Sequence, residues 1–450
     1  MSSEIVSLLW AFAAVVVLIL MITRAKLNPF LALSITAIAL GLVNGLTPGE
    51  VIDAFKDGVG AILGGTAPTI GLGVILGSLL LGSGGADKIV DSFLGQRPVA
   101  WIPSLICVAA VIIGLPHLFD VSFVMLAPLV YTVARRRNVH LLWVGLPLAS
   151  GLYVSHGLLP PHPSPTAAVS AYGANTGLTI AYGLIIAVPT AIVCGPLFTR
   201  FARRWFGPAP DLDGGPAPVT DVEPERPGHP VSLALSLISV LMPPVLMLIG
   251  TIGTANTAEG TAPYNVFEAF NDSIISLLVA VVFAFFALGR RSGFSAGQLQ
   301  KMSGKGLAAV GPIILILGAG GALKQMFTAT GVDAIIADHA GSWSIPAVVL
   351  AWVVAALLRI CLGSATVATT AATGIVAPLL AADPTLSPEL LVLATASGSV
   401  MLSHVNDSGF WLFKEYYQLS VKQTFRTWTL MLSIQSLIGL AGVVVLSAVI

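Results

Sequence analysis

Long apolar runs recur along the whole chain and alternate with short polar stretches. Twelve runs can be separated, at residues 5–23, 27–45, 61–82, 99–133, 140–173, 177–199, 231–252, 271–289, 305–328, 346–381, 389–421 and 430–449. Most have the length of about 17–25 residues that an α-helix needs to cross a bilayer. A strand of a transmembrane barrel would instead alternate apolar and polar residues. The pattern therefore predicts an all-α polytopic membrane protein.

Several of these runs are too long for one straight crossing. Runs 99–133 and 346–381 are interrupted, the first by three prolines and the second by Gly-Ser-Ala-Thr at 363–366. We expect each to form two short helices folded back as a re-entrant hairpin. Runs 140–173 and 389–421 carry polar residues at their middle, and we expect a broken helix in each. Non-helical backbone at membrane depth is tolerated where it is buried in protein or lines a wet cavity.

Basic residues suggest how the chain is oriented, because Lys and Arg are enriched on the cytoplasmic side of short loops. They flank the runs as Arg24, Lys26, Lys88, Arg97, Arg135, Arg136, Arg137, Arg200, Arg203, Arg204, Arg290 and Arg291. Placing all of them inside puts both termini outside the cell (inner) membrane. Segment 99–133 must then enter and leave on the same side, which supports a hairpin independently of its prolines.

The chain divides into two halves that resemble each other. A polar segment rich in Pro and Gly, 203–230, separates 1–202 from 231–450 and is expected to be a cytoplasmic linker. Ala-Ser-Gly precedes Ser-His in both halves, and His404 stands 248 positions after His156. Two further matches follow at nearly the same offset. Five full crossings in each half would invert the second copy, a common plan of secondary transporters. The chain would then have about 10 full transmembrane helices, two hairpins and two broken helices.

Composition agrees with a membrane protein and argues against some partners. The chain is 56% hydrophobic and 9% charged, against roughly 25% charged in soluble domains. Its formal net charge is +0, so the basic surface that nucleic-acid binding requires is not indicated. We expect the lipid bilayer as the surroundings, and neither a cofactor nor a metal.

The middle of run 140–173 combines two histidines with four prolines in the stretch SHGLLPPHPSP. A continuous helix of this length would exceed a bilayer core of about 30 Å, and proline keeps the backbone from closing into a helix. We expect two half-helices whose freed backbone faces a ligand together with Ser155, His156 and His162. The alternative is an ordinary exposed loop between two helices.

The corresponding stretch of run 389–421 reads SHVNDSGFW. Ser403, His404, Asn406 and Asp407 form a compact polar cluster, and ionisable residues at membrane depth are functional candidates. The amide of Asn406 and the serine hydroxyls suit hydroxyl groups of a ligand. The alternative is a polar loop at the cytoplasmic surface. The aromatic residues that follow are expected at the membrane interface: Trp411, Phe413, Tyr416 and Tyr417.

The two hairpin turns supply the remaining candidates. Asp120 and Ser122 lie near the first turn, where Asp120 could carry a proton or be a surface charge. Arg359, Ser364 and Thr366 belong to the second. The planar guanidinium of Arg359 could pair a substrate carboxylate, or it could equally hold the hairpin by bonding backbone carbonyls. The candidates for proton coupling are Asp120, His156, His404 and Asp407.

Three motifs together resemble the gluconate permease family. They are SHG with PPHP and PT within 155–166, LGSAT at 362–366, and SHVND with GFWLFKEY within 403–416. The resemblance covers nearly the whole chain and implies GntP-type proton-coupled uptake of gluconate or a related sugar acid, or of D-serine or another organic acid. The ion-transporter superfamily, to which that family belongs, implies an elevator mechanism. Hairpins and broken helices would move against a dimerising scaffold, so a homodimer is expected.

The leading hypothesis is thus a secondary active transporter, not an enzyme, for a small organic anion and a coupling proton. Sodium coupling stays open, because unwound carbonyls and hydroxyl oxygens also suit sodium. A remote alternative is an intramembrane zinc enzyme, although the sequence lacks an HExxH motif. Its ligands would be His156, His162, His404 and Asp407. A channel is a third class, from which saturable uptake abolished by an uncoupler would distinguish a transporter.

Overall fold

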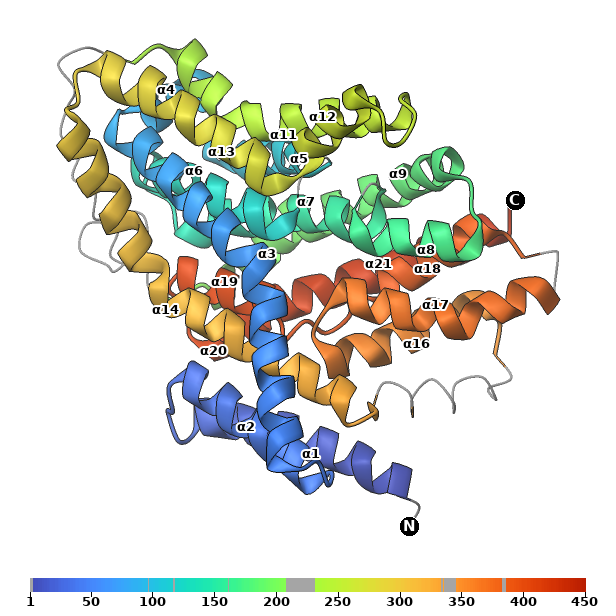
Figure 1. The fold of residues 1–450 in the computed structure, drawn as a ribbon. Helices are drawn as coiled ribbons and strands as arrows, with labels where there is room; N and C mark the ends of the chain where they lie inside the picture. Colours follow the sequence, from blue (N-terminus) through green and yellow to red (C-terminus); the bar gives the residue numbers. More distant parts are fainter. Residues whose placement is uncertain are drawn as a thin grey trace.

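The computed structural model is built of α-helices with short 3₁₀ and π turns (Figure 1). It describes residues 3–95, 97–115, 118–160, 162–207, 231–332, 335, 345–382 and 386–450. Most of the expected linker 203–230 lies outside the described residues, as does part of the turn in run 99–133.

The helices follow the apolar runs of the sequence. In the first half they are α1 (Ser3–Thr23), α2 (Pro29–Val43), α3 (Pro48–Gly82), α4 (Gly85–Leu94), α5 (Ile102–Gly114), α6 (Phe119–Arg137), α7 (Leu141–Leu158), α8 (Pro163–Tyr172), α9 (Thr176–Ile192) and α10 (Phe198–Ala202). In the second half they are α11 (Leu233–Ala255), α12 (Ala262–Asn271), α13 (Ser273–Ala284), α14 (Ala296–Ala329), α16 (Ala347–Leu362), α17 (Ala365–Ala382), α18 (Pro388–Gly398), α19 (Ser408–Tyr416), α20 (Val421–Thr424) and α21 (Leu430–Ser447). Short π turns lie at Val193–Leu197, Phe285–Gly289 and Phe425–Thr429, and 3₁₀ turns lie at Val99–Trp101, Arg203–Trp205 and Arg290–Ser292. Helices α4 and α12 occur where no element was predicted.

Seven helical stretches within the described residues are long and apolar enough to cross a membrane. The prediction of an all-helical, multi-span membrane protein is thereby confirmed. The other three expected crossings are 5–23, 27–45 and 389–421. The first two form shorter apolar helices, and the third is interrupted between α18 and α19. The total of ten full crossings therefore stays a prediction.

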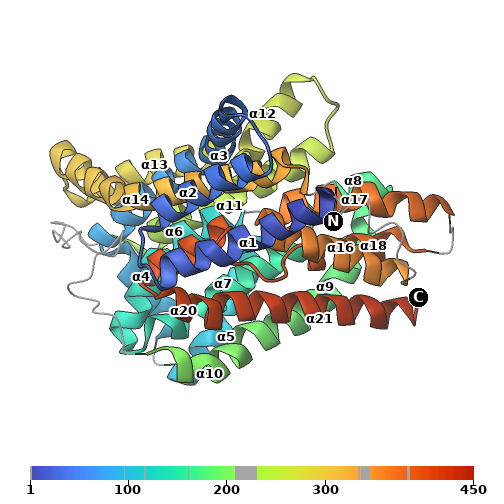
Figure 2. The ribbon, with the colours of Figure 1, turned by 90° about the horizontal axis from the view of Figure 1, so that it is seen from below.

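Helices α3 and α14 form a long antiparallel pair, on which α2 packs from one side (Figures 1 and 2). Gly58 of α3 meets Gly321 of α14, where a Cβ on either glycine would lie 2.4 Å from the carbonyl oxygen of the other. At the other end Gly306 faces Val74 and Ser78. The backbones touch at the Gly58–Gly321 crossing, which a larger residue would push apart.

Both long helices begin earlier than their apolar runs, 61–82 and 305–328. Each starts with a capping box, in which Thr47 pairs with Glu50 and Ser295 with Gln298. These side chains satisfy backbone N–H groups of the first turn. The helix therefore starts in the polar stretch before the apolar run, a boundary that apolar content alone does not mark.

The two broken helices end and restart within the polar stretches of the sequence. Helix α7 ends at Leu158 and α8 begins at Pro163, with His162 as its N-cap residue. Proline is favoured at the first helical position because its missing N–H needs no partner there. Helix α18 ends at Gly398, and α19 begins after its N-cap residue Asp407. The prolines of the first break thus start a second helix as well as ending the first.

The two broken helices run in opposite directions. At one end of the molecule the backbone N–H of Asn175, just after α8, donates to Glu389 at the start of α18, at 2.9 Å. At the other end Gly145, near the start of α7, packs against the ring of Tyr417, just after α19. This relation is the one that an inverted repeat requires. The inversion, the re-entrant course of the hairpins and the membrane orientation stay predictions.

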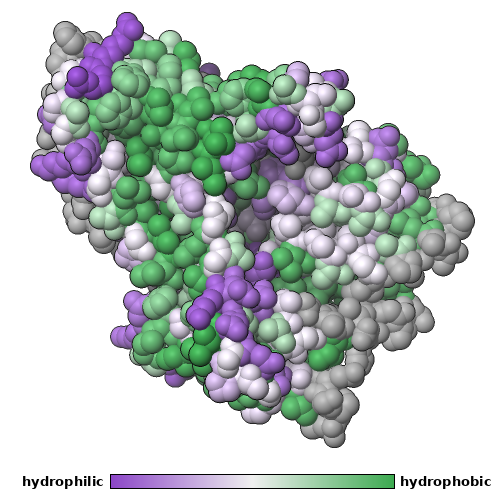
Figure 3. Space-filling view, in the orientation of Figure 1, coloured by the Kyte–Doolittle hydropathy of each residue, from purple (hydrophilic) through white to green (hydrophobic). Residues whose placement is uncertain are grey.

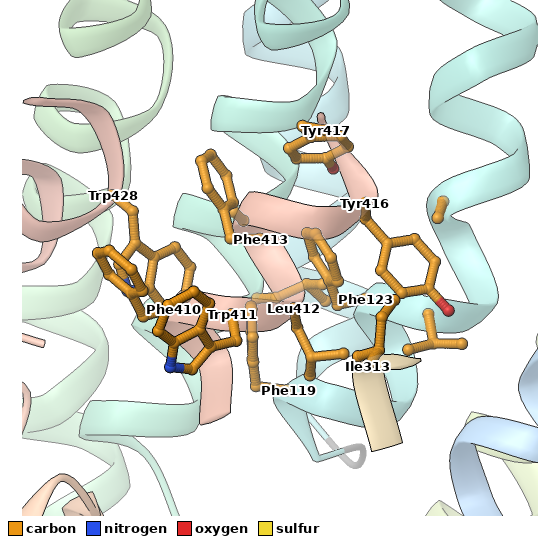
Figure 4. Close-up of a cluster of buried hydrophobic side chains, with 14 of the residues drawn as sticks. Phe119, Phe123, Ile313, Phe410, Trp411, Leu412, Phe413, Tyr416, Tyr417 and Trp428 are labelled. Atoms are coloured by element: carbon orange, nitrogen blue, oxygen red, sulfur yellow. The ribbon is translucent and has the colours of Figure 1, made fainter. Parts of the chain in front are cut away.

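A cluster of aromatic side chains joins the first hairpin to the second broken helix (Figure 4). Phe119 and Phe123 of α6 contact rings of α19 and Trp428, with centroids 5.2 Å apart for Phe119 and Trp428. The residues expected at the membrane interface are instead buried in this cluster, so that expectation is wrong. The cause is that α19 lies inside the protein, where its aromatic rings pack on one another.

The predicted orientation can be tested with single cysteines on a background in which Cys107, Cys194 and Cys361 are replaced by alanine. We expect Leu386→Cys to react with a membrane-impermeant maleimide added to intact cells. Arg135→Cys should react after lysis alone, because it would face the cytoplasm. Labelling of both variants from outside would contradict the inverted arrangement.

Candidate functional site

A cavity of about 230 Å³ lies where the hairpin turns, the two breaks and the long helix pair meet. Its wall is formed by Ile62, Thr66, Leu118, Phe119, Asp120, Tyr153, His156, Pro163, Leu317, Gly320, Gly321, Lys324, Arg359, Gly363, Ser364, Ala365, Thr366, Asn406, Asp407, Ser408 and Gly409. Figure 3 shows a hollow with hydrophilic side chains near the centre of one face, between apolar regions. The wall thus combines charged groups, hydroxyls and glycines within an apolar molecule.

A buried ion pair forms part of this wall. Nη2 of Arg359, in the last turn of α16, donates to Oδ2 of Asp407, and both side chains are almost completely buried. Nη2 also donates to the hydroxyl of Tyr153, at 3.2 Å. Arg359 was expected to pair a substrate carboxylate or backbone carbonyls. Its charge is instead compensated by an acid of the protein, 48 positions away in the sequence.

Two further hydrogen bonds hold the carboxylate of Asp407. The hydroxyl of Ser403 donates to Oδ2, and the N–H of Gly409 donates to Oδ1 at 3.0 Å. Asp407 therefore caps α19 while it pairs with Arg359. Ser403 in turn accepts from Nε1 of Trp428 at 2.7 Å, so its hydroxyl is occupied behind the cavity wall.

Each break is hydrogen-bonded to the end of a hairpin helix in the same half. In the first half, Nε2 of His162 bonds the carbonyl of Gly114 at 2.7 Å. In the second half, Nε2 of His404 bonds the carbonyl of Ile360 at 2.9 Å, and Asn406 donates to the same carbonyl at 2.8 Å. The last carbonyls of a helix lack intrahelical partners, so these side chains satisfy them and join break to hairpin.

His156 differs from these two histidines because it lines the cavity. Its ring lies 5.1 Å from that of His162 and 5.5 Å from that of Tyr153, between centroids. Nδ1 of His156 is buried, with no hydrogen-bond partner among the described residues. Of the histidines in the two breaks, His156 is therefore the one placed to contact a ligand.

Asp120 lies in the first turn of α6, at the tip of the first hairpin, and lines the cavity. It shares this wall with Arg359 and Asp407. No hydrogen bond of its carboxylate is found in the described part of the chain. The structure thus places Asp120 inside the protein rather than on a surface turn.

The sequence as a whole matches known transporters. The model of the GntP family permeases covers residues 6–449. The chain belongs to this family. It is 41% identical to a gluconate permease of Pseudomonas aeruginosa over 100% of this chain and 99% of that one. It is 40% identical to the high-affinity gluconate transporter of Escherichia coli over 97% and 98% of the two chains.

Two other similarities are more distant. The D-serine transporter DsdX of Escherichia coli O6:H1 is 33% identical over 97% of both chains. The YdaH transporter of Alcanivorax borkumensis has a solved structure that covers 94% of this chain and 98% of its own, at a TM-score of 0.45 and 17% identity. That structural likeness is too weak to support an argument. The family shows that the protein is a membrane transporter and not an enzyme.

The structure of this GntP family permease sorts the predicted site residues into two groups. Those in the cavity wall are Asp120, His156, Arg359, Ser364, Thr366, Asn406 and Asp407. Those outside it are Ser122, Ser155, His162, Ser403 and His404. Ser155 donates to the carbonyl of Val111 at 2.9 Å, which again joins a break to a hairpin helix. No described residues form a cluster of three or more His, Cys, Asp or Glu that could hold a metal ion.

The predicted site left out four polar residues of the wall, Thr66, Tyr153, Lys324 and Ser408. Lys324 carried a usable signal, because a lone charge within an apolar membrane helix is a functional candidate. Tyr153 and Thr66 carried none, because hydroxyl-bearing residues are common in membrane helices.

The ion pair can be tested by comparing a single with a double variant. Arg359→Leu should lower the stability of the permease by about 3–5 kcal/mol, because it leaves Asp407 buried and unpaired. Adding Asp407→Asn should recover much of that loss, since asparagine can still cap α19. Thermal unfolding of the detergent-solubilised proteins measures both. A double variant no more stable than the single one would show that the charges do not depend on each other.

Proposed function

We propose that this permease takes up gluconate, or a related small hydroxylated carboxylate, together with a proton. The observation that carries this is the cavity, because two acids, three basic side chains and several hydrogen-bonding groups lie at the meeting point of both breaks and both hairpin turns. The relatives described as gluconate permeases support the same substrate class.

The size and lining of the cavity suit a small polar anion. A volume of about 230 Å³ is below the roughly 300–1,000 Å³ of sites for drug-sized ligands. Ser364, Thr366 and Asn406 offer hydroxyl and amide groups to the hydroxyls of a sugar acid. A buried site made to bond hydroxyl groups discriminates against analogues that lack them.

Asp120 is the proposed carrier of the proton. It faces the same cavity as the substrate, so its protonation and substrate binding can influence each other directly. His156 is a second candidate on the same wall. His404 and Asp407 are engaged in the structural bonds described above, which makes them poorer proton carriers. Sodium coupling is the competing proposal.

We also propose an elevator mechanism in a homodimer. The hairpins and broken helices are hydrogen-bonded to one another and would move as one unit. The pair α3 and α14 forms the other part of the cavity wall and would belong to the scaffold. Both termini would lie outside the cell membrane, and the segment 203–230 would be cytoplasmic.

Uptake into proteoliposomes tests the function. Labelled gluconate should accumulate when the outside is acidified, and the accumulation should saturate and disappear with an uncoupler. Unlabelled gluconate, idonate and D-serine are added as competitors. If D-serine alone competes strongly, the substrate is an amino acid and not a sugar acid. Accumulation driven by a sodium gradient at constant pH would replace the proton by sodium.

If Asp120 carries the proton, its replacement should separate substrate exchange from accumulation driven by a pH gradient. Asp120→Asn should still exchange labelled for unlabelled gluconate across the membrane, because exchange needs no net proton movement. It should lose accumulation driven by an imposed pH gradient. Asp53→Asn, which changes an exposed acid of α3, serves as the control and should keep both activities. Full pH-driven accumulation by the Asp120 variant would exclude this residue as the carrier.

A further inference from the structure

Lys324 of α14 lines the cavity and is the charged residue of the helix wall there. Gly320 and Gly321, about one turn before it, line the same cavity, and Gly321 is fixed by its close contact with Gly58 of α3. Ala322, Leu323, Met326 and Phe327 on that helix are fully buried. The position of Lys324 is thus set by a tightly packed helix crossing, while its side chain is half-buried at the cavity wall.

The arginine and the lysine of the cavity wall differ in their partners. Arg359 is paired with Asp407 and also bonds Tyr153. Lys324 has no ion pair or hydrogen bond of its ammonium group with any described residue. An ammonium group placed within a membrane helix is costly unless it meets water or an opposite charge. Lys324 therefore supplies a positive charge of the cavity that no ion pair among the described residues holds.

We propose that Lys324 binds the carboxylate of the transported substrate. This inference rests on the proposed function and adds the residue that selects for a negative charge. A charge-assisted hydrogen bond from an ammonium group to a carboxylate is among the stronger contacts available to a small ligand. Arg359 then acts as a positioning residue, because its charge is used within the protein.

This assignment also orients the substrate. Its carboxylate would face the wall formed by α3 and α14, where Lys324 lies. Its hydroxyl groups would face the hairpin turn and break that carry Ser364, Thr366 and Asn406. A bound sugar acid would therefore contact both groups of helices that enclose the cavity, with its charged end on α14.

The test compares a charged and a neutral ligand of the same shape. Binding of gluconate and of gluconamide, which lacks the negative charge, is measured with purified wild type, Lys324→Gln, Lys324→Arg and Lys301→Gln. Lys301 is an exposed lysine of the same helix and serves as the matched control. Lys324→Gln should weaken gluconate binding by about 10- to 100-fold, the range that one charge-assisted hydrogen bond supplies. Gluconamide binding should change little, and Lys324→Arg should keep a preference for gluconate.

Each outcome has a distinct meaning. Unchanged gluconate affinity in Lys324→Gln would overturn the inference. Equal losses for gluconate and gluconamide would also overturn it, because they would indicate a structural role. The wild-type arm tests the proposed function separately, with idonate and D-serine as further carboxylates. If wild type binds none of these acids, the proposed function fails and the role of Lys324 falls with it.

Discussion

The buried ion pair of Arg359 and Asp407 is the interaction on which the site depends. It joins the end of α16 to the start of α19, and so fixes the second hairpin turn against the second break. Removing either charge would destabilise the fold, because the other would stay buried without water or an opposite charge to compensate its lost hydration. Ser403, Gly409 and Tyr153 add hydrogen bonds that hold the pair in one geometry.

Because this pair is internally neutral, the charge of the cavity is decided by Asp120 and Lys324. With His156 neutral, the empty cavity carries one negative and one positive group. On the proposed assignment, adding a carboxylate and a proton together again leaves no net charge. Adding either one alone leaves a net charge, which is costly to carry through a medium of low dielectric constant. The coupling of anion to proton would then follow from charge balance within a small cavity.

Much of the fold could be predicted because apolar length and proline are local signals. The runs located the helices, and the polar stretches located both breaks. The pairing of Arg359 with Asp407 could not be predicted, since it joins residues 48 positions apart. Lys324 was missed, because sequence alone does not say which side of α14 faces a cavity. His162 could not be assigned before its bond to the carbonyl of Gly114 was seen.

The bonds from the breaks to the hairpin helices also decide how the site can become accessible. Lifting one hairpin turn by itself would strip partners from the carbonyls of Gly114, or of Ile360 and Cys361. Each buried polar group left unsatisfied costs about 1–3 kcal/mol. Displacing hairpin and break as one rigid piece keeps all of these bonds. Opening a hairpin turn alone therefore costs more free energy than moving hairpin and break together. We expect the ligand to enter along the boundary with α3 and α14.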